Sequence, residues 1–172
     1  MTEHAEARVA IRKAGTEVLD RLEPLWLALH DHHQSVAPPA AYQPGEDSWR
    51  ARRAAYAQWL ADPGSFVLVA ERGSRLVGYA LVAVRPGPDD TWVSGDRLAE
   101  LETLSVAPQE RGQGIGTRLL DAVDAELARL GIGDLFIAAL VGNEGAIRLY
   151  ERRGLRPVMT YLARFAADGN PG

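Results

Sequence analysis

Residues 98–130 read LAELETLSVAPQERGQGIGTRLLDAVDAELARL and join a strand-like run to an amphipathic helix through a glycine-rich loop. The helical pattern spans 114–130, and its apolar side chains recur on one face: Ile115, Leu119, Val123, Leu127 and Leu130. Gly131 is placed to end this helix. The short apolar run at 135–141 is typical of a strand covered on both faces. The stretch therefore predicts a parallel strand–loop–helix–strand crossover.

Outward from this unit, strands and helices alternate along the chain. Strands are predicted at 8–13, 66–72, 75–84, 98–106 and 158–165, and Gly73-Ser74 forms a hairpin turn between the second and third of these. Further helices are predicted at 16–33, where Pro24 breaks or kinks the helix, at 48–61, capped by Ser48, and at 144–153, ended by Gly154. The segments 34–47 and 85–96 read as loops. The order predicts an α/β chain with helices packed on a mixed sheet.

Composition limits the class of protein. The 172 residues predict a single domain with a core at about 8–165 and frayed termini, and 47% hydrophobic residues suffice for a core. No apolar run approaches the roughly 20 residues that span a bilayer, and MTEHAEARVAIRK lacks the apolar segment of a signal peptide. These features predict a cytoplasmic protein that does not bind membranes.

The chain has no cysteine, which excludes disulfides, zinc held by cysteine and a cysteine nucleophile. Its net charge of −4 argues against a nucleic-acid partner, because neutralising phosphates requires clustered basic residues. The same negative charge mildly favours a cationic binding partner such as an amine.

The glycine-rich loop consists of Arg111, Gly112, Gln113, Gly114, Ile115, Gly116 and Thr117. The start of a helix offers unpaired N–H groups and a partial positive charge to a phosphate, and glycines permit close approach. A P-loop needs a lysine that is missing here, and a dinucleotide fingerprint needs a glycine where Thr117 stands. The CoA pyrophosphate loop, R/Q-x-x-G-x-G/A, matches at every position. A glycine-rich turn without a ligand is the other alternative.

Two motifs together resemble the GNAT family of N-acetyltransferases. LETLSVAPQERGQGIGTRLLDAV at 101–123 resembles the family's motif A, and NEGAIRLYERRGLRP at 143–157 resembles its motif B. The matching positions of motif B are Asn143, Ala146, Leu149, Tyr150, Gly154 and Leu155. One apolar strand separates the motifs, as in the family. The close match covers about a third of the chain, and the order of elements extends it to nearly all.

The resemblance implies a mostly antiparallel sheet with helices on both faces and a parallel fourth and fifth strand pair that splays apart around the pantetheine of acetyl-CoA. Backbone groups of Leu104, Ser105 and Val106 would pair with the pantetheine as an added strand does. Residues 112–117 would hold the pyrophosphate through N–H groups, with Arg111 adding charge and with Asn143, Ala146 and Tyr150 as further contacts. No metal is implied, and many family members form homodimers through their sheets.

The implied activity is acetyl transfer to a primary amine on a small molecule or a protein, directly within a ternary complex. Tyr150 matches the family's general acid, although a tyrosine on the buried face of a helix is the structural alternative. Glu100 and Glu102, two residues apart on one strand, are candidate bases, and a water chain is the alternative. Asn143 fits a cofactor contact and also a helix N-cap. A catalytically silent acyl-CoA-binding module would share all these motifs.

The acceptor walls are expected within 16–62 and 85–97, which match no motif, so acyl length and the acceptor stay open: antibiotic, polyamine, amino acid or protein amine. Three groups of residues there have structural explanations. His30, His32 and His33 predict a polar helix end, with a lining of the acceptor site as the second interpretation, in preference to a metal site. Trp49, Tyr56 and Trp59 predict packing of a helix onto the sheet, with a lid as the alternative. Arg50, Arg52 and Arg53 predict a solvated helix face.

Overall fold

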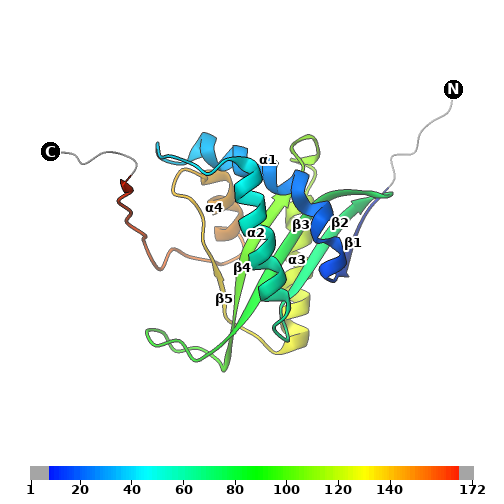
Figure 1. The fold of residues 1–172 in the computed structure, drawn as a ribbon. Coiled ribbons are helices and arrows are strands. Elements are labelled where there is room, and N and C mark those ends of the chain that lie inside the picture. Colours follow the sequence, from blue (N-terminus) through cyan, green and yellow to red (C-terminus); the bar gives the residue numbers. More distant parts are fainter. Residues whose placement is uncertain (1–7, 167–172) are drawn as a thin grey trace.

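A computed structural model describes residues 8–166, in which helices cover both faces of a five-stranded sheet (Figure 1). The sheet consists of β1 (Val9–Ala14), β2 (Phe66–Arg72), β3 (Arg75–Pro86), β4 (Arg97–Val106) and β5 (Leu135–Ile137). The helices are η1 (Thr16–Leu22), α1 (Glu23–Val36), α2 (Gly45–Leu60), η2 (Pro108–Glu110), α3 (Ile115–Leu130) and α4 (Glu144–Glu151), where η marks a 3-10 helix. The expectations for the N-terminal seven residues and for the final DGNPG lie outside the described residues.

The strands follow chain order across the sheet, and every neighbouring pair is antiparallel except the parallel pair β4 and β5. This arrangement confirms the predicted mixed, mostly antiparallel sheet and the parallel crossover through α3. None of the helices between residues 8 and 166 has the length and apolar character that crossing a membrane requires.

Alternation along the central strands explains why both faces of the sheet are covered. In β2, Phe66 and Leu68 join the apolar cluster under α3, whereas Val67 and Val69 join the cluster under η1, α1 and α2. All four side chains are at most 5% exposed. A strand buried on both faces needs apolar side chains at consecutive positions, and FVLVA supplies them.

A β-bulge interrupts the pairing of β3 with β4. Leu81 lies opposite Thr103 and Val82 lies opposite Leu101, so Glu102 has no partner on β3. Before the bulge, Leu101 packs into the cluster under α3; after it, Thr103 bonds to Tyr56 of α2 on the other face. One extra residue therefore changes which residues of β4 face which layer of helices.

The predicted splaying of the fourth and fifth strands is confirmed. The pairing of β4 with β5 covers only Ala99 to Leu101 and ends opposite Ile137. Residues 102–106 of β4 continue along β3 without pairing with β5. This side of β4 therefore carries backbone groups that are free of strand partners within the described part of the chain.

Two strands predicted at the C-terminal side differ from the structure. The strand predicted at 135–141 ends at Ile137, and the next residues run to Gly142, which lies so close to the Val36 carbonyl of α1 that a Cβ atom would meet it at 1.7 Å. The strand predicted at 158–165 is absent, because residues 155–165 pair with no strand of the sheet. The segment lies away from the sheet (Figure 1), with Tyr161 84% and Leu162 94% exposed.

The helix predicted at 16–33 is in two pieces, as Pro24 indicated: the 3-10 helix η1 and then α1, with Pro24 in its first turn. The predicted start of α2 is wrong, since Pro44 precedes the first helical residue and Ser48 lies one turn inside. The Ser48 hydroxyl instead accepts a 3.1 Å hydrogen bond from Trp26 Nε1. The packing interpretation of the α2 aromatics is confirmed, because Trp49 and Tyr56 are buried in the core.

Candidate functional site

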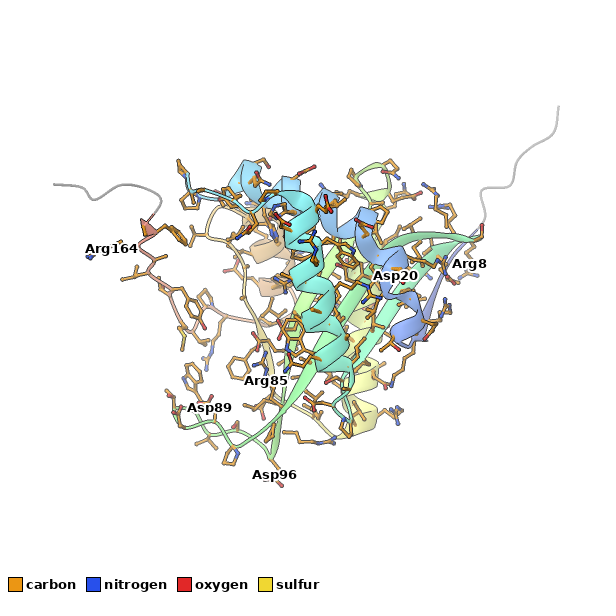
Figure 2. The ribbon with its side chains drawn as sticks, in the orientation of Figure 1. Arg8, Asp20, Arg85, Asp89, Asp96 and Arg164 are labelled. Atoms are coloured by element: carbon orange, nitrogen blue, oxygen red, sulfur yellow. The ribbon has the colours of Figure 1, made fainter. Side chains whose placement is uncertain are left out.

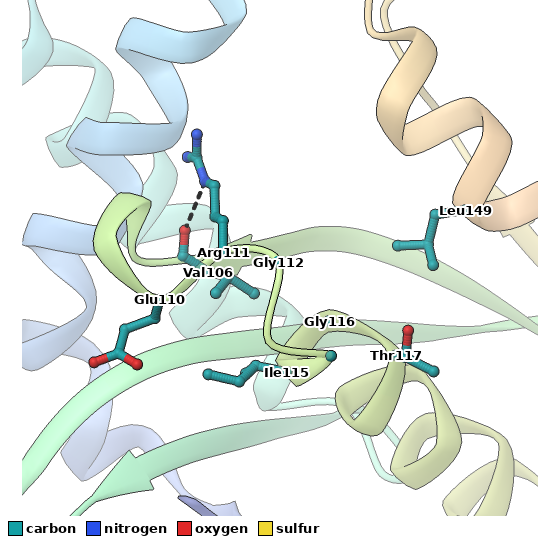
Figure 3. A pocket seen from close by; sticks show the side chains of 9 residues that line it. Val106, Glu110, Arg111, Gly112, Ile115, Gly116, Thr117 and Leu149 are labelled. Atoms are coloured by element: carbon teal, nitrogen blue, oxygen red, sulfur yellow. Dashed lines mark hydrogen bonds between the residues drawn. The ribbon is translucent and has the colours of Figure 1, made fainter. Parts of the chain in front are cut away.

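The predicted glycine loop borders a pocket at the start of α3. The pocket has a volume of about 240 Å³ and is lined by Val106, Glu110, Arg111, Gly112, Gly114, Ile115, Gly116, Thr117 and Leu149. Figure 3 shows Leu149 of α4 facing the loop from the opposite side. A Cβ atom on Gly116 would lie 3.9 Å from both Val106 Cγ2 and Leu149 Cδ2. The end of β4, the start of α3 and the body of α4 therefore converge on this pocket.

The loop glycines give the backbone a shape that other residues adopt with strain. Gly112 and Gly114 have φ angles of 76° and 78°, and no atom lies within 4 Å of the Cβ position of either residue. The first helical hydrogen bond of α3 runs from Arg118 N to the Gly114 carbonyl. The N–H groups of Ile115, Gly116 and Thr117 precede that bond, so this turn presents donors at the positive end of a 16-residue helix.

An ion-pair network that the sequence analysis missed holds the loop from behind. One Arg72 nitrogen, Nη2, donates to Glu110 Oε2 and to Gln113 Oε1, each at 2.9 Å, and Arg75 Nη2 donates to Glu110 Oε1 at 2.5 Å. Glu110 is 5% exposed, and its hydrogen bond with Arg72 lowers the pKa of its carboxyl. The carboxylate therefore stays charged and is neutralised by two guanidinium groups. Its partners lie 35 and 38 residues away in sequence, so no local pattern signalled the network.

Arg111 lines the pocket with an exposed side chain. Its Nε donates a 3.1 Å hydrogen bond to the Val106 carbonyl (Figure 3). Among the three β4 residues expected to pair with a pantetheine, Val106 thus already has a partner for its carbonyl. Leu104 and Ser105 lie on the part of β4 that β5 leaves free, outside the pocket itself.

Tyr150 lies on α4, next to the pocket residue Leu149. Its ring packs against the apolar cluster under α3, and burial raises the pKa of Tyr150 to about 12. Asn143 is the N-cap of α4, and its side chain accepts a 3.4 Å hydrogen bond from Ala146 N. The capping interpretation of Asn143 is therefore confirmed, and the phenol of Tyr150 is protonated at neutral pH.

The two candidate bases on β4 share one cation. Arg85 Nη2 lies 2.5 Å from Glu102 Oε1 and 3.0 Å from Glu100 Oε2. Figure 2 shows Arg85 near the end of β3, before the loop that carries Asp89 and Asp96. The Glu102 side chain is 10% exposed and that of Glu100 is 35% exposed. Burial raises the pKa of Glu102, the charge of Glu100 adds to the increase, and Arg85 opposes it.

The other polar groups singled out from the sequence have different environments. His30 is 8% exposed, and its Nε2 lies 2.8 Å from the Gln43 carbonyl, so it belongs to the core and not to a polar helix end. Within residues 8–166 no group of three His, Cys, Asp or Glu side chains could hold a metal ion. Arg50 and Arg53 pair with acidic residues at the surface, as expected, but Arg52 lies over aromatic rings.

Comparison with known proteins identifies relatives of this arrangement. The model of the acetyltransferase (GNAT) family matches residues 26–155. A mycothiol acetyltransferase from Geodermatophilus obscurus is 33% identical over 116 residues, which are 66% of this chain and 36% of that protein. The N-alpha-acetyltransferase RimI from Mycobacterium tuberculosis is 32% identical over 114 residues, which are 66% of this chain and 65% of that protein. The chain thus spans about a third of the first relative's length.

Solved structures share the fold across nearly the whole chain. A GCN5-related N-acetyltransferase from Ralstonia eutropha has a TM-score of 0.74 at 22% identity, covering 92% of this chain and 99% of that one. A predicted acetyltransferase from Clostridium acetobutylicum, solved with acetyl-CoA, has a TM-score of 0.70 at 18% identity, covering 94% and 98%. With the family match over residues 26–155, these similarities establish that the chain belongs to the acetyltransferase (GNAT) family.

Proposed function

We propose that the protein transfers an acetyl group from acetyl-CoA to a primary amine, directly and within a ternary complex. The observation that carries the proposal is the pocket at the start of α3, where the glycine loop meets α4 beside the unpaired part of β4. The names of the relatives support acetyl transfer and point to different acceptors. They leave the acceptor of this chain open.

The residues of the pocket fit the donor. Open space above Gly112 and Gly114, free N–H groups at the start of α3 and the guanidinium of Arg111 suit a pyrophosphate. The free edge of β4 suits the amides of a pantetheine, which pair with a strand through backbone hydrogen bonds. When bound, acetyl-CoA supplies an acetyl thioester to this site.

The chain's own residues provide the proton transfers. The acceptor amine must lose a proton as its nitrogen forms a bond to the acetyl carbon, and Glu102 is the proposed base because burial makes it more basic than an ordinary glutamate. The carbon–sulfur bond breaks, and the Tyr150 hydroxyl is the proposed donor of a proton to the leaving sulfur. Direct transfer is proposed because the 172 residues contain no cysteine, which excludes an acyl-cysteine intermediate.

The first test is amine-dependent release of free thiol from acetyl-CoA with the purified protein. The acceptor panel contains amino acids, a polyamine, an aminoglycoside, and peptides with a free N-terminus or lysine. At least one amine should accelerate thiol release, and initial-rate lines should intersect, as a ternary complex requires. Parallel lines with a trapped acyl-protein would contradict direct transfer. Binding of acetyl-CoA without turnover by any amine would instead indicate a silent acyl-CoA-binding module.

The second prediction concerns the donor pocket. Gly116→Val places methyl groups between Val106 and Leu149 without a positive φ angle, and should weaken acetyl-CoA binding at least about tenfold, or roughly 1.4 kcal/mol. Gly114 is a poorer target, since its φ of 78° would strain any replacement. Gly133→Val is the control, because Gly133 lies beyond the far end of α3 and has open space around it. Calorimetry showing equal affinities for both folded variants would exclude the pocket as the donor site.

The third prediction concerns the acid. Tyr150→Phe keeps the ring that packs against the core and removes the hydroxyl, so acetyl-CoA affinity and thermal stability should change little. The value of kcat should fall by about 10²-fold or more, as expected for a lost general acid. A wild-type kcat under conditions where chemistry limits the rate would reduce Tyr150 to a packing residue.

The fourth prediction separates the two glutamates. A base works only when deprotonated, so wild-type kcat/KM should fall as pH drops through a pKa above the ordinary value of 4.5. Glu102→Gln should lower kcat/KM by about 10²-fold and remove this decrease at low pH, which is the acidic limb of the pH profile. Glu100→Gln should keep the limb but move it to lower pH, because the charge of Glu100 helps to raise the Glu102 pKa. The opposite assignment of effects would make Glu100 the base, and an unchanged limb in both variants would favour a water chain.

A further inference from the structure

Arg52 occupies an unusual position among the three arginines of α2. Arg50 pairs with Glu46 and Asp47 on the surface, and Arg53 pairs with Asp20 of η1 at 2.6 Å. Arg52 is partly buried, and its guanidinium carbon lies 4.4 Å from the centre of the Trp26 ring. The same carbon is 5.9 Å from the Tyr56 ring centre and 5.8 Å from that of Trp59.

These aromatic contacts use the face of the Arg52 guanidinium and leave its N–H donors without an aromatic partner. A guanidinium that lies over a ring uses its face, whereas its five N–H donors point outward in the plane of the group. Within residues 8–166, Arg52 makes no ion pair or hydrogen bond. Partial burial of a charge without an acidic partner is unfavourable. The N–H groups at the edge of this guanidinium are therefore suited to bind an anion from outside the chain.

The location of Arg52 connects it with the proposed base. The hydroxyl of Tyr56, one of the rings below Arg52, lies 2.5 Å from Thr103 Oγ1, and Thr103 directly follows Glu102 in β4. The charge of Arg52 also acts on Glu102 and lowers its pKa, opposing the effect of burial. Arg52 therefore faces the same region as the carboxylate that is proposed to take the proton from the amine.

Two basic groups that share these surroundings, His33 and Arg85, do not provide a second free cation. Burial, with smaller effects of His32, His30 and Arg52, lowers the pKa of His33 to about 4, so this neighbour is neutral at pH 7. Arg85 is already engaged by Glu100 and Glu102. The planar fork of a guanidinium bonds to both oxygens of a carboxylate, and its single positive charge balances the single negative charge of that group.

We propose that Arg52 binds a carboxylate of the acceptor, so that the substrate is an amine carrying a carboxylate near its amino group, as an amino acid does. This inference rests on the proposed acetyl transfer and specifies its acceptor class. Two N–H donors of Arg52 would hold the carboxylate, while the amino group faces Glu102. Arg52 is then a residue that determines specificity, and the aromatic rings of Trp26, Tyr56 and Trp59 fix its orientation.

The test uses L-amino acids and dipeptides, each paired with its own C-terminal carboxamide, which keeps the shape and removes the charge. The wild-type protein should favour the carboxylate of a matched pair by about 10- to 100-fold in kcat/KM, the usual effect of hydrogen bonds to a charged group. Arg52→Met keeps much of the apolar stem on Trp26 and should bring this ratio to near one, mainly through KM. Arg52→Lys should restore only part of the ratio, because it lacks the fork, and Arg50→Met should keep the wild-type ratio.

The same pairs are titrated by calorimetry into the protein saturated with CoA, which gives a readout without turnover. Equal wild-type preference for acid and carboxamide, or equal losses for both in Arg52→Met, would overturn the proposal and leave Arg52 as a packing residue. Absence of transfer to any amine, with binding of carboxylates that depends on Arg52, would refute acetyl transfer and support the anion site. Absence of both transfer and carboxylate binding would refute both proposals.

Discussion

Glu102 has no partner on β3, and the rest of the site depends on this single unpaired residue. Because side chains alternate along a strand, one extra residue reverses the facing of everything that follows. Thr103 and Ser105 consequently face the α1 and α2 layer, where they bond to Tyr56 and to the Leu25 carbonyl. Leu104 and Val106 pack toward α3. Without the bulge, hydroxyl groups would face the apolar cluster under α3, and leucine would replace them beside α2.

The bulge also explains where the sheet opens. Pairing with β5 ends at Leu101, one residue before Glu102, since a strand that bends at a bulge diverges from a straight parallel neighbour. The buried hydroxyl of Tyr56 holds this position by bonding to both Thr103 and Tyr79, at 2.5 and 2.9 Å. The bulge therefore leaves an edge of β4 free for the proposed donor and places a carboxylate where the acceptor is proposed to bind. The two halves of the proposed reaction are positioned by the same strand.

The sequence predicted those elements whose cause is local. The apolar stripe of α3, the hairpin between β2 and β3 and the capping of α4 by Asn143 all follow from patterns within a few residues. The strand predicted at 158–165 is absent because a strand also requires a neighbouring strand, which no local pattern reveals. Ser48 matched an N-cap by residue type, but its hydroxyl bonds to Trp26, 22 residues earlier. The partners of Arg72 and Arg85 and the Trp26 ring below Arg52 were equally hidden, since each lies on another element.

The arginines of the site have two different roles, which the net charge of −4 does not show. Some neutralise carboxylates, and others keep their positive charge unpaired. Glu110 lines the proposed donor pocket, where a carboxylate would repel a pyrophosphate. Arg72 and Arg75 neutralise this carboxylate and leave Arg111 as an exposed positive charge. On β4, Arg85 offsets two carboxylates only in part, since the pKa of Glu102 stays raised. Arg52, which contacts aromatic rings and no acidic side chain among the described residues, contributes positive charge at the proposed acceptor side. Each end of the proposed site thus keeps one guanidinium without an acidic partner among the described residues. Such an arrangement favours an anionic donor at one end and a carboxylate-bearing acceptor at the other.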